Sequence, residues 1–172
     1  MSAKSWNFNV FWMSFRVTYN DFIGTTNNAP LEFKVNNIFA GGIYPKGGNT
    51  ILGPNSMIYG SNNVHGVVAI GSGALRNNSQ SNLVAVGNSA MFNVGTGFLV
   101  GYLPEENVAI GSRAMFSNLL GKGGTAVGFK SLYSNIGGDN NTAIGDWSMY
   151  SNHGDNNTAL GYSTMKSNYS GE

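Results

Sequence analysis

The stretches Asn141-Thr142-Ala143-Ile144-Gly145 and Asn157-Thr158-Ala159-Leu160-Gly161 are two copies of one short motif. The motif consists of Asn or Gly, Thr or Val, Ala, an aliphatic residue and Gly, and it recurs seven times along the chain. Successive copies are about 16 to 17 residues apart, with one longer interval between Gly87 and Gly111. A short fixed period is the signature of a repeat protein. The glycines of the seven copies are Gly53, Gly71, Gly87, Gly111, Gly128, Gly145 and Gly161.

Alignment of the copies gives columns with distinct chemical requirements. The residue before each motif glycine is aliphatic, the one before that is alanine in six copies, and Leu or Met stands four residues after the glycine. The aliphatic column contains Leu52, Ile70, Val86, Ile110, Val127, Ile144 and Leu160. The Leu/Met column contains Met57, Leu75, Met91, Met115, Leu132, Met149 and Met165. An aromatic column then precedes a predicted Ser-Asn turn and contains Phe92, Phe116, Tyr133 and Tyr150.

The length of the repeat selects the fold. It is too short for a helix pair or a propeller blade, and it fits one coil of a β-solenoid. The Thr-Ala-Ile stretch alternates between two faces as a strand does, while glycine allows positive φ or close approach of backbone. Gly-Asp and Asn-Asn clusters supply the corners. We therefore predict an all-β fold, a parallel β-roll of about seven coils stacked about 4.8 Å apart.

The apolar columns predict how such rolls associate. Two short strands per coil leave a flat, narrow interior, which suits the alanine column but cannot hold both the aliphatic and the Leu/Met columns. A monomer would expose apolar stripes along its length, and surfaces of that kind normally mark protein interfaces. Identical rods around a common axis bury such a stripe. We predict a homotrimer with the aliphatic column facing the axis; an exchange of the Ala and Ile faces is the alternative.

The repeats resemble the head repeats of YadA-type trimeric autotransporter adhesins, for which Asn107-Val108-Ala109-Ile110-Gly111 is the nearest copy. Residues 141–152 look even more like the longer repeats of phage and phage-like tail-fibre proteins. Residues 21–37 resemble the segment that often precedes such repeats in bacterial fibre-like proteins. The resemblance implies a left-handed parallel β-roll, an intertwined or side-by-side trimer, adhesion or fibre roles, and no catalytic residues.

The chain divides into two parts. Residues 1–48 are expected to form an aromatic-rich N-terminal β cap or attachment segment, in which Trp6, Phe8, Val10 and Trp12 alternate as a strand would. This segment either caps the first coil, which otherwise presents an open strand edge, or docks onto another fibre protein or a baseplate. A second alternating strand is expected at residues 31–35. Residues 49–172 form the roll.

Composition argues against most catalytic and nucleic-acid functions. Charged residues make up 10% of the chain and the net charge is +1, with Lys and Arg scattered singly, so no nucleic-acid footprint is expected. There is no cysteine, and His65 and His153 form no His-Glu-x-x-His motif. No apolar run approaches the roughly 18 residues that span a bilayer. We expect no enzyme activity, no metal, no cofactor and no membrane insertion.

Two minor columns invite a ligand hypothesis. Asp139, Asp155 and Glu172 recur in one corner, but one carboxylate per coil is too few for a calcium ion that takes six to eight oxygens. Solvated turn residues are the favoured interpretation. Threonines recur before the alanine column in four coils, which is too sparse for the regular arrays of ice-binding solenoids.

An insertion at about residues 94–106 interrupts the array. Insertions in solenoids emerge on one face and commonly bind partners. Its apolar residues either pack against the roll or a neighbouring chain, or contact a target. The candidate receptor contacts are Phe98, Tyr102 and Glu105.

The sequence thus predicts a structural and adhesive segment of a trimeric fibre, a stiff spacer and attachment module of a phage or phage-like tail fibre. The expected location is an extracellular fibre or particle tail, and the expected target is a cell-surface receptor or glycan. The alternative is a fragment of a bacterial cell-surface adhesin head. A second alternative, a monomeric solenoid that binds glycan or ice, would require the aliphatic column to lie inside the roll.

Overall fold

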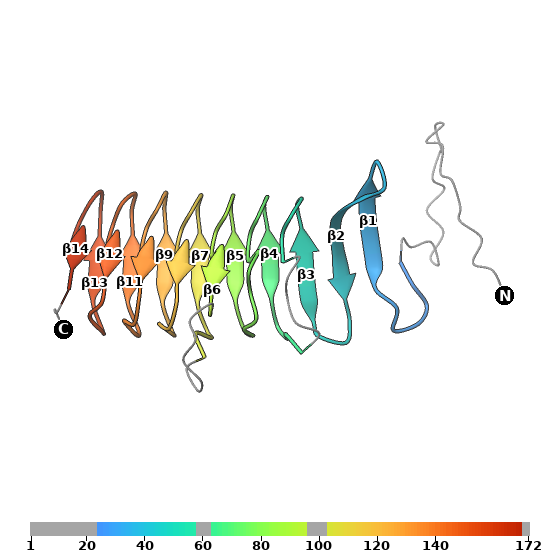
Figure 1. The fold of residues 1–172 in the computed structure, drawn as a ribbon, viewed down its shortest axis with the longest axis horizontal. Helices are drawn as coiled ribbons and strands as arrows, with labels where there is room; N and C mark the ends of the chain where they lie inside the picture. The colour runs from blue at the N-terminus through green and yellow to red at the C-terminus, as the bar shows by residue number, and fades with distance from the viewer. Residues whose placement is uncertain (1–23, 58–62, 96–102, 170–172) are drawn as a thin grey trace, which may run out of the picture.

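The computed structural model describes residues 24–57, 63–95 and 103–169 (Figure 1). These residues form an all-β solenoid with no helix among them. The aromatic residues predicted to alternate between Trp6 and Trp12 lie outside the described residues, as do Phe98 and Tyr102. Figure 1 shows the coils in chain order along one axis.

Seven copies of the motif form the parallel part of a nine-stranded sheet. Each strand pairs with the next in the same register, so that Ala85 lies opposite Ala109 and Ala126 opposite Ala143. Seven stacked strands bound about six turns of the solenoid, slightly fewer than the seven coils expected. The parallel strands are β3 (Asn49–Leu52), β4 (Val68–Ile70), β5 (Val84–Val86), β7 (Val108–Ile110), β9 (Thr125–Val127), β11 (Thr142–Ile144) and β13 (Thr158–Leu160).

A second parallel sheet forms the other side of the roll. It consists of two-residue strands, most of which are the Ser-Asn pairs that the sequence predicted to be turns. That prediction was wrong because each pair finds an identical pair one coil away, and stacked backbones hydrogen-bond even over two residues. The strands are β6 (Asn93–Val94), β8 (Ser117–Asn118), β10 (Ser134–Asn135), β12 (Ser151–Asn152) and β14 (Ser167–Asn168).

An antiparallel hairpin precedes the first coil. Strand β1 (Leu31–Val35) is the alternating strand expected at these positions, and it pairs with β2 (Ile38–Tyr44). Asn36 and Asn37 have left-handed φ values of 49° and 60°, as the tight turn between the strands requires. Strand β2 then pairs antiparallel with β3, so the hairpin covers the outer edge of the first parallel strand.

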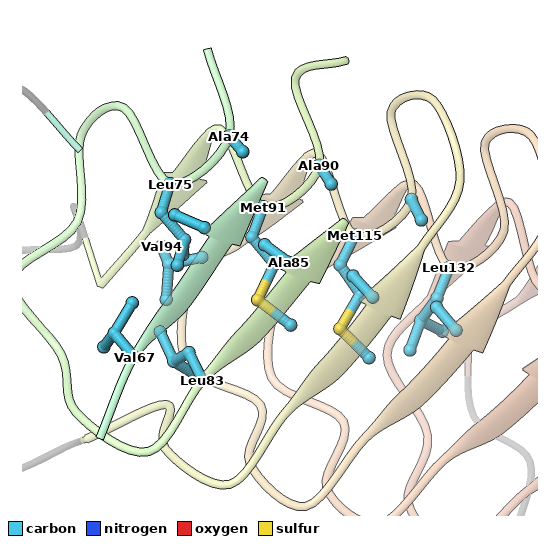
Figure 2. Packing of buried hydrophobic residues seen from close by; sticks show 14 of the residues in the cluster. Val67, Ala74, Leu75, Leu83, Ala85, Ala90, Met91, Val94, Met115 and Leu132 are labelled. Atoms are coloured by element: carbon cyan, nitrogen blue, oxygen red, sulfur yellow. The ribbon is translucent and has the colours of Figure 1, made fainter. Parts of the chain in front are cut away.

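The interior of the roll is narrow and apolar. Alanines of the motif, such as Ala85 and Ala109, point inward and are fully buried. Figure 2 shows Leu75, Met91 and Met115 in a row, one in each of three successive coils, with their side chains directed toward the alanine strands. Further apolar residues, such as Leu83, Ala90 and Val94, are also fully buried in this interior, where facing layers interdigitate without large voids. The Leu/Met column therefore fills the space that the alanines leave.

The turn after each motif glycine uses left-handed backbone repeatedly. In one coil φ is 135° at Gly111, 59° at Arg113 and 47° at Met115, and the other coils repeat the pattern. A Cβ atom added to Gly87 would lie 2.5 Å from the carbonyl oxygen of Gly111, so glycine is required there by close approach as well as by φ. The left-handed Leu and Met residues were not foreseen from the sequence; for those from Leu75 to Met149, complete burial offsets the conformational cost.

Asparagine side chains form a polar ladder inside the corner next to the second sheet. The Nδ2 of Asn135 donates to the Oδ1 of Asn118 at 3.2 Å, and Asn168 donates to Asn152 at 2.9 Å. Asn135 also donates to the carbonyl oxygen of Gly138 at 2.6 Å. The ladder satisfies buried amide groups that would otherwise be costly, and it holds neighbouring coils in register.

Candidate interaction surface

The outward side chains of the parallel sheet form a continuous apolar row. Alanine faces the interior, so the aliphatic residue that follows it faces outward, and the register places Ile70 opposite Val86 and Ile144 opposite Leu160. Exposed fractions are 50% for Leu52 and 43% for Ile110. We call this set the aliphatic row, and it contains Leu52, Ile70, Val86, Ile110, Val127, Ile144 and Leu160.

A second outward row runs beside the first. It consists of the residue two places before each member of the aliphatic row, and every member is Val or Thr, which are β-branched and uncharged. These residues pair in the same register, for example Val84 with Val108 and Thr125 with Thr142. The second row contains Thr50, Val68, Val84, Val108, Thr125, Thr142 and Thr158. The two rows together form a flat surface without charge, which we call the outer face.

The outer face continues onto the hairpin. Ile43 pairs with Thr50 and with Leu31, which extends the second row over β2 and β1. Phe33 lies across Gly41 from Leu52, which extends the aliphatic row. Phe33 is 43% exposed and Ile43 48% exposed. At about 4.8 Å per strand, nine strands give an uncharged strip about 38 Å long.

The structure separates the two apolar columns that the sequence grouped as trimer or core positions. Members of the Leu/Met column between Leu75 and Met149 are buried inside the roll, whereas Met57 is half-buried and Met165 is 40% exposed in the last coil. The aliphatic column lies on the outside. The two columns thus occupy opposite sides of the sheet wall, and alanine, not the aliphatic residue, is the inward position of each strand.

The structure describes only part of the predicted insertion. Phe98 and Tyr102 lie outside the described residues, so the predicted contact with a receptor stays a prediction. Glu105 is half-buried, and its backbone accepts a hydrogen bond from the N–H of Gly123 at 3.1 Å while its own N–H donates to Leu103. The end of the insertion is therefore tied to the next coil by backbone hydrogen bonds.

A second surface feature lies along the turns that follow the motif glycines. The aromatic column forms a stack in which the ring centroids of Phe92 and Phe116 are 5.1 Å apart, and those of Tyr133 and Tyr150 are 4.9 Å apart. The planes of these rings differ by 8° to 9°. We call the stack the aromatic ladder; its members are Phe92, Phe116, Tyr133 and Tyr150. The sequence showed the column but not the cations and further rings that gather beside it.

The acidic corner has a structural role. The N–H of Asp139 donates to the carboxylate of Asp155 at 2.8 Å, and the N–H of Lys122 donates to Asp139 at 2.9 Å. The carboxylates of Asp139 and Asp155 therefore each accept a backbone hydrogen bond from the preceding coil, instead of being only solvated turn groups, while Glu172 lies outside the described residues. Within the described ranges no group of three His, Asp or Glu side chains is placed to hold a metal ion.

The two histidines lie in different environments. His65 is exposed, and the ring of His153 stacks on Tyr169 with centroids 5.2 Å apart. For the part of the chain that the structure describes, no helix is long and apolar enough to cross a membrane. The outer face and the aromatic ladder are the two extended side-chain arrays on the surface of the roll. Comparison of the chain with models of protein families, with curated proteins and with solved structures found no match.

Proposed function

We propose that this chain is a non-enzymatic segment of a trimeric fibre, a stiff spacer that also serves attachment. The observation that carries the proposal is the outer face, an uncharged and largely apolar surface over nine strands, seven of which repeat in register. Exposed apolar surface of this extent normally marks an interface between proteins. Its repetition along the roll axis favours a partner with the same repeat, and a second copy of this chain has it.

The direction of the strip favours a ring of parallel copies. If the symmetry axis runs along the roll, each coil of one copy meets the same coil of the next copy, and Ile110 of each copy packs near Ile110 of its neighbours. Closed rings of identical subunits bury such a surface without leaving a free face. The number three follows from the resemblance to YadA-type repeats. The placement of Ile110 and Ile144 outside the roll speaks against the monomeric solenoid, which would need them inside.

An assembly of such rolls would form a stiff rod. The coils from β5 onward pair their backbones with neighbouring coils in two parallel sheets, so this part of the roll cannot bend without breaking several hydrogen bonds at once. A phage or phage-like tail fibre is the proposed setting, because the longer repeat form resembles those proteins. A bacterial surface adhesin head is the alternative setting. In either case the receptor or glycan would be met outside the cell.

Solution mass tests the assembly. Light scattering on the purified chain should give about three times the 18.2 kDa chain mass, and the oligomer should resist dissociation when heated in detergent. The double variant Ile110→Asp/Ile144→Asp should give 18.2 kDa with its β circular dichroism retained, because charges in a desolvated stripe are costly.

A matched control is available at Ile136. This residue is 41% exposed, similar to Ile110, but it follows β10 on the other side of the roll. Ile136→Asp should leave the oligomer intact. A wild-type chain that is folded, rich in β structure and monomeric at high concentration would overturn the proposed trimer, as would a variant at Ile110 and Ile144 that assembles like the wild type.

A further inference from the structure

Cations gather along the aromatic ladder. The guanidinium carbon of Arg76 lies 5.7 Å from the ring centroid of Phe92, and Lys130 Nζ lies 5.8 Å from that of Tyr133. Lys166 Nζ is 5.6 Å from the centroid of Trp147, which itself packs 4.9 Å from Tyr150. Arg113 is exposed and occupies in its coil the position that Lys130 occupies in the next. We call this set the cationic edge; it consists of Arg76, Arg113, Lys130 and Lys166.

Two of these cations stand at a position where long side chains are unfavourable. The residue two places after the motif glycine is left-handed in every coil, and φ is 59° at Arg113, 54° at Lys130 and 61° at Trp147. Asn and Gly tolerate this conformation best, and Asn55 and Gly73 hold the position in the first two coils. Three consecutive coils instead carry Arg, Lys and Trp. Packing between Lys130 and Trp147, whose Nζ atom and ring centroid lie 4.2 Å apart, offsets part of this conformational cost and holds the Lys130 ammonium group beside the aromatic ladder.

The ladder presents a positive surface to a ligand. Aromatic rings are negative on their faces and positive at their edges. Because the rings of Phe116, Tyr133 and Tyr150 stack on one another at 4.9 to 5.1 Å with nearly parallel planes, their faces are covered and their edges remain. Ring edges and four cations on one side of the roll attract anions. Asp146 lies on the same edge, but its carboxylate already accepts the N–H of Phe129 at 2.8 Å.

The spacing fits an extended ligand with regularly placed charges. Arg113 and Lys130 belong to adjacent coils, whose backbones lie about 4.8 Å apart, and Arg76 and Lys166 extend the edge in both directions. Tyr133 and Tyr150 add hydroxyl groups that both donate and accept hydrogen bonds. Nucleic acid is disfavoured, because binding of single strands uses open ring faces on which bases stack, and here the faces are covered.

We propose that the cationic edge and the aromatic ladder bind an acidic glycan, a saccharide chain that carries carboxylate groups. Arg113 and Lys130 bind the carboxylates by charge-assisted hydrogen bonds, and the tyrosine hydroxyls contact the sugar hydroxyls. This site deepens the attachment role proposed above and rests on that role for its biological use, although the binding itself requires only the folded roll.

Calorimetric titration with oligogalacturonate tests the site. The wild type should bind this carboxylate-bearing probe, and the affinity should fall as salt is raised. Arg113→Asn/Lys130→Asn should weaken binding by about tenfold or more. The melting temperature should fall by only a few degrees, because Asn suits the left-handed backbone, as at Asn55, and so offsets part of the lost contacts of Lys130 with Trp147. The control Lys46→Gln/Lys122→Gln removes two exposed cations elsewhere and should change the affinity by less than about twofold.

The same titrations can also contradict the proposed glycan site. Equal affinity of the wild type and the Arg113/Lys130 variant would overturn the site, as would equally tight binding of a neutral cello-oligosaccharide or no binding of oligogalacturonate at millimolar concentration. Tighter binding of a single-stranded oligodeoxythymidylate would replace the glycan with nucleic acid. Light scattering on the same samples reports the assembly separately, so a monomeric chain that binds the probe would contradict the trimer and leave the glycan site standing.

Discussion

The side-chain amide of Asn152 donates to the side-chain oxygen of Asn135, one coil away, at 3.1 Å, and both residues are fully buried. The same relationship joins Asn135 to Asn118. Each amide therefore acts as donor and acceptor along the axis of the roll, and the ladder links coils that are otherwise held by backbone pairing and apolar packing. Its members are polar groups that water cannot reach, so each depends on its neighbours.

Removal of one rung should be costly. In the variant Asn135→Ala, the Oδ1 of Asn118 and the carbonyl oxygen of Gly138 lose their donor in a buried site. We expect a loss of about 2 to 3 kcal/mol in the free energy of unfolding, measured by urea denaturation. Asn88→Ala is the control, since Asn88 is exposed and should change stability by less than about 0.5 kcal/mol. Equal effects of the two substitutions would contradict the role of the ladder.

Close packing of successive turns should make Gly87 irreplaceable. A Cβ atom at Gly87 would meet the carbonyl carbon and oxygen of Gly111 at 2.5 to 2.6 Å, whereas one at Gly48 would meet nothing within 4 Å. Both glycines have positive φ, but 63° at Gly48 lies in the left-handed region that L residues adopt at modest cost, whereas 140° at Gly87 lies outside it. Close approach and backbone conformation therefore both disfavour a side chain at Gly87. Gly87→Ala should prevent stable folding, and Gly48→Ala should cost only about 1 kcal/mol. Circular dichroism during heating distinguishes them, and similar melting temperatures would refute this explanation.

Core and exposed methionines with the same backbone conformation should differ in importance. Met115 has a φ of 47° and is fully buried, while Met165 has a φ of 45° and is 40% exposed. Met115→Ala should lower the free energy of unfolding by about 2 to 5 kcal/mol, and Met165→Ala by much less. Met115→Leu should cost less than about 1.5 kcal/mol, because Leu132 fills the same position in the next coil. Denaturant titrations of the three variants check the order.

The hairpin should weaken at high pH. Burial, the negative charge of Glu32 and a hydrogen bond to Glu32 at 3.2 Å raise the pKa of Tyr44 from 10.0 to about 12. The folded chain thus keeps a proton that the unfolded chain releases, so this stabilisation is complete below pH 10 and is lost as the pH rises toward 12. Thermal unfolding of wild type and Tyr44→Phe at several pH values checks this.

The comparison with Tyr44→Phe separates the effect of Tyr44 ionisation on stability from the effects of the other tyrosines. The wild type should lose stability relative to Tyr44→Phe between pH 10 and 12, because the variant has no proton to lose at this position. Tyr162→Phe serves as the control, since Tyr162 is 78% exposed. Curves of melting temperature against pH that run parallel for the wild type and Tyr44→Phe would show that ionisation of Tyr44 does not affect folding.

The sequence predicts those parts of the fold in which inward-facing and outward-facing side chains alternate along a strand. In Val108-Ala109-Ile110 the small residue must face inward, so the strand, its register and the outward aliphatic row all follow from the repeat. The second sheet could not be foreseen, because Ser134-Asn135 reads as a turn until a copy stacks on it. The inward Asn135 and the left-handed Met115 were missed for a similar reason: their partners belong to the neighbouring coils.

The candidate sites differ in the same way. The aliphatic row was visible because each member stands at a fixed distance from a motif glycine. The cationic edge was not, because Arg113, Lys130 and Lys166 look like scattered single charges along the chain, and they form a row only when coils are superposed. The aromatic ladder was predicted in part. Its column was recognised in the sequence, but the contact between Trp147 and Lys130 became visible only in the structure.

The uniform register of the parallel strands has a consequence for how such a chain can change over generations. Ala126 meets Ala143 as Ala143 meets Ala159, so an extra coil placed between two others would find the same partners above and below. Duplication of one repeat in the gene should therefore lengthen the rod by a single step and leave its cross-section untouched. Recombination can therefore change the length of the rod by one coil at a time, without changing what its surface binds.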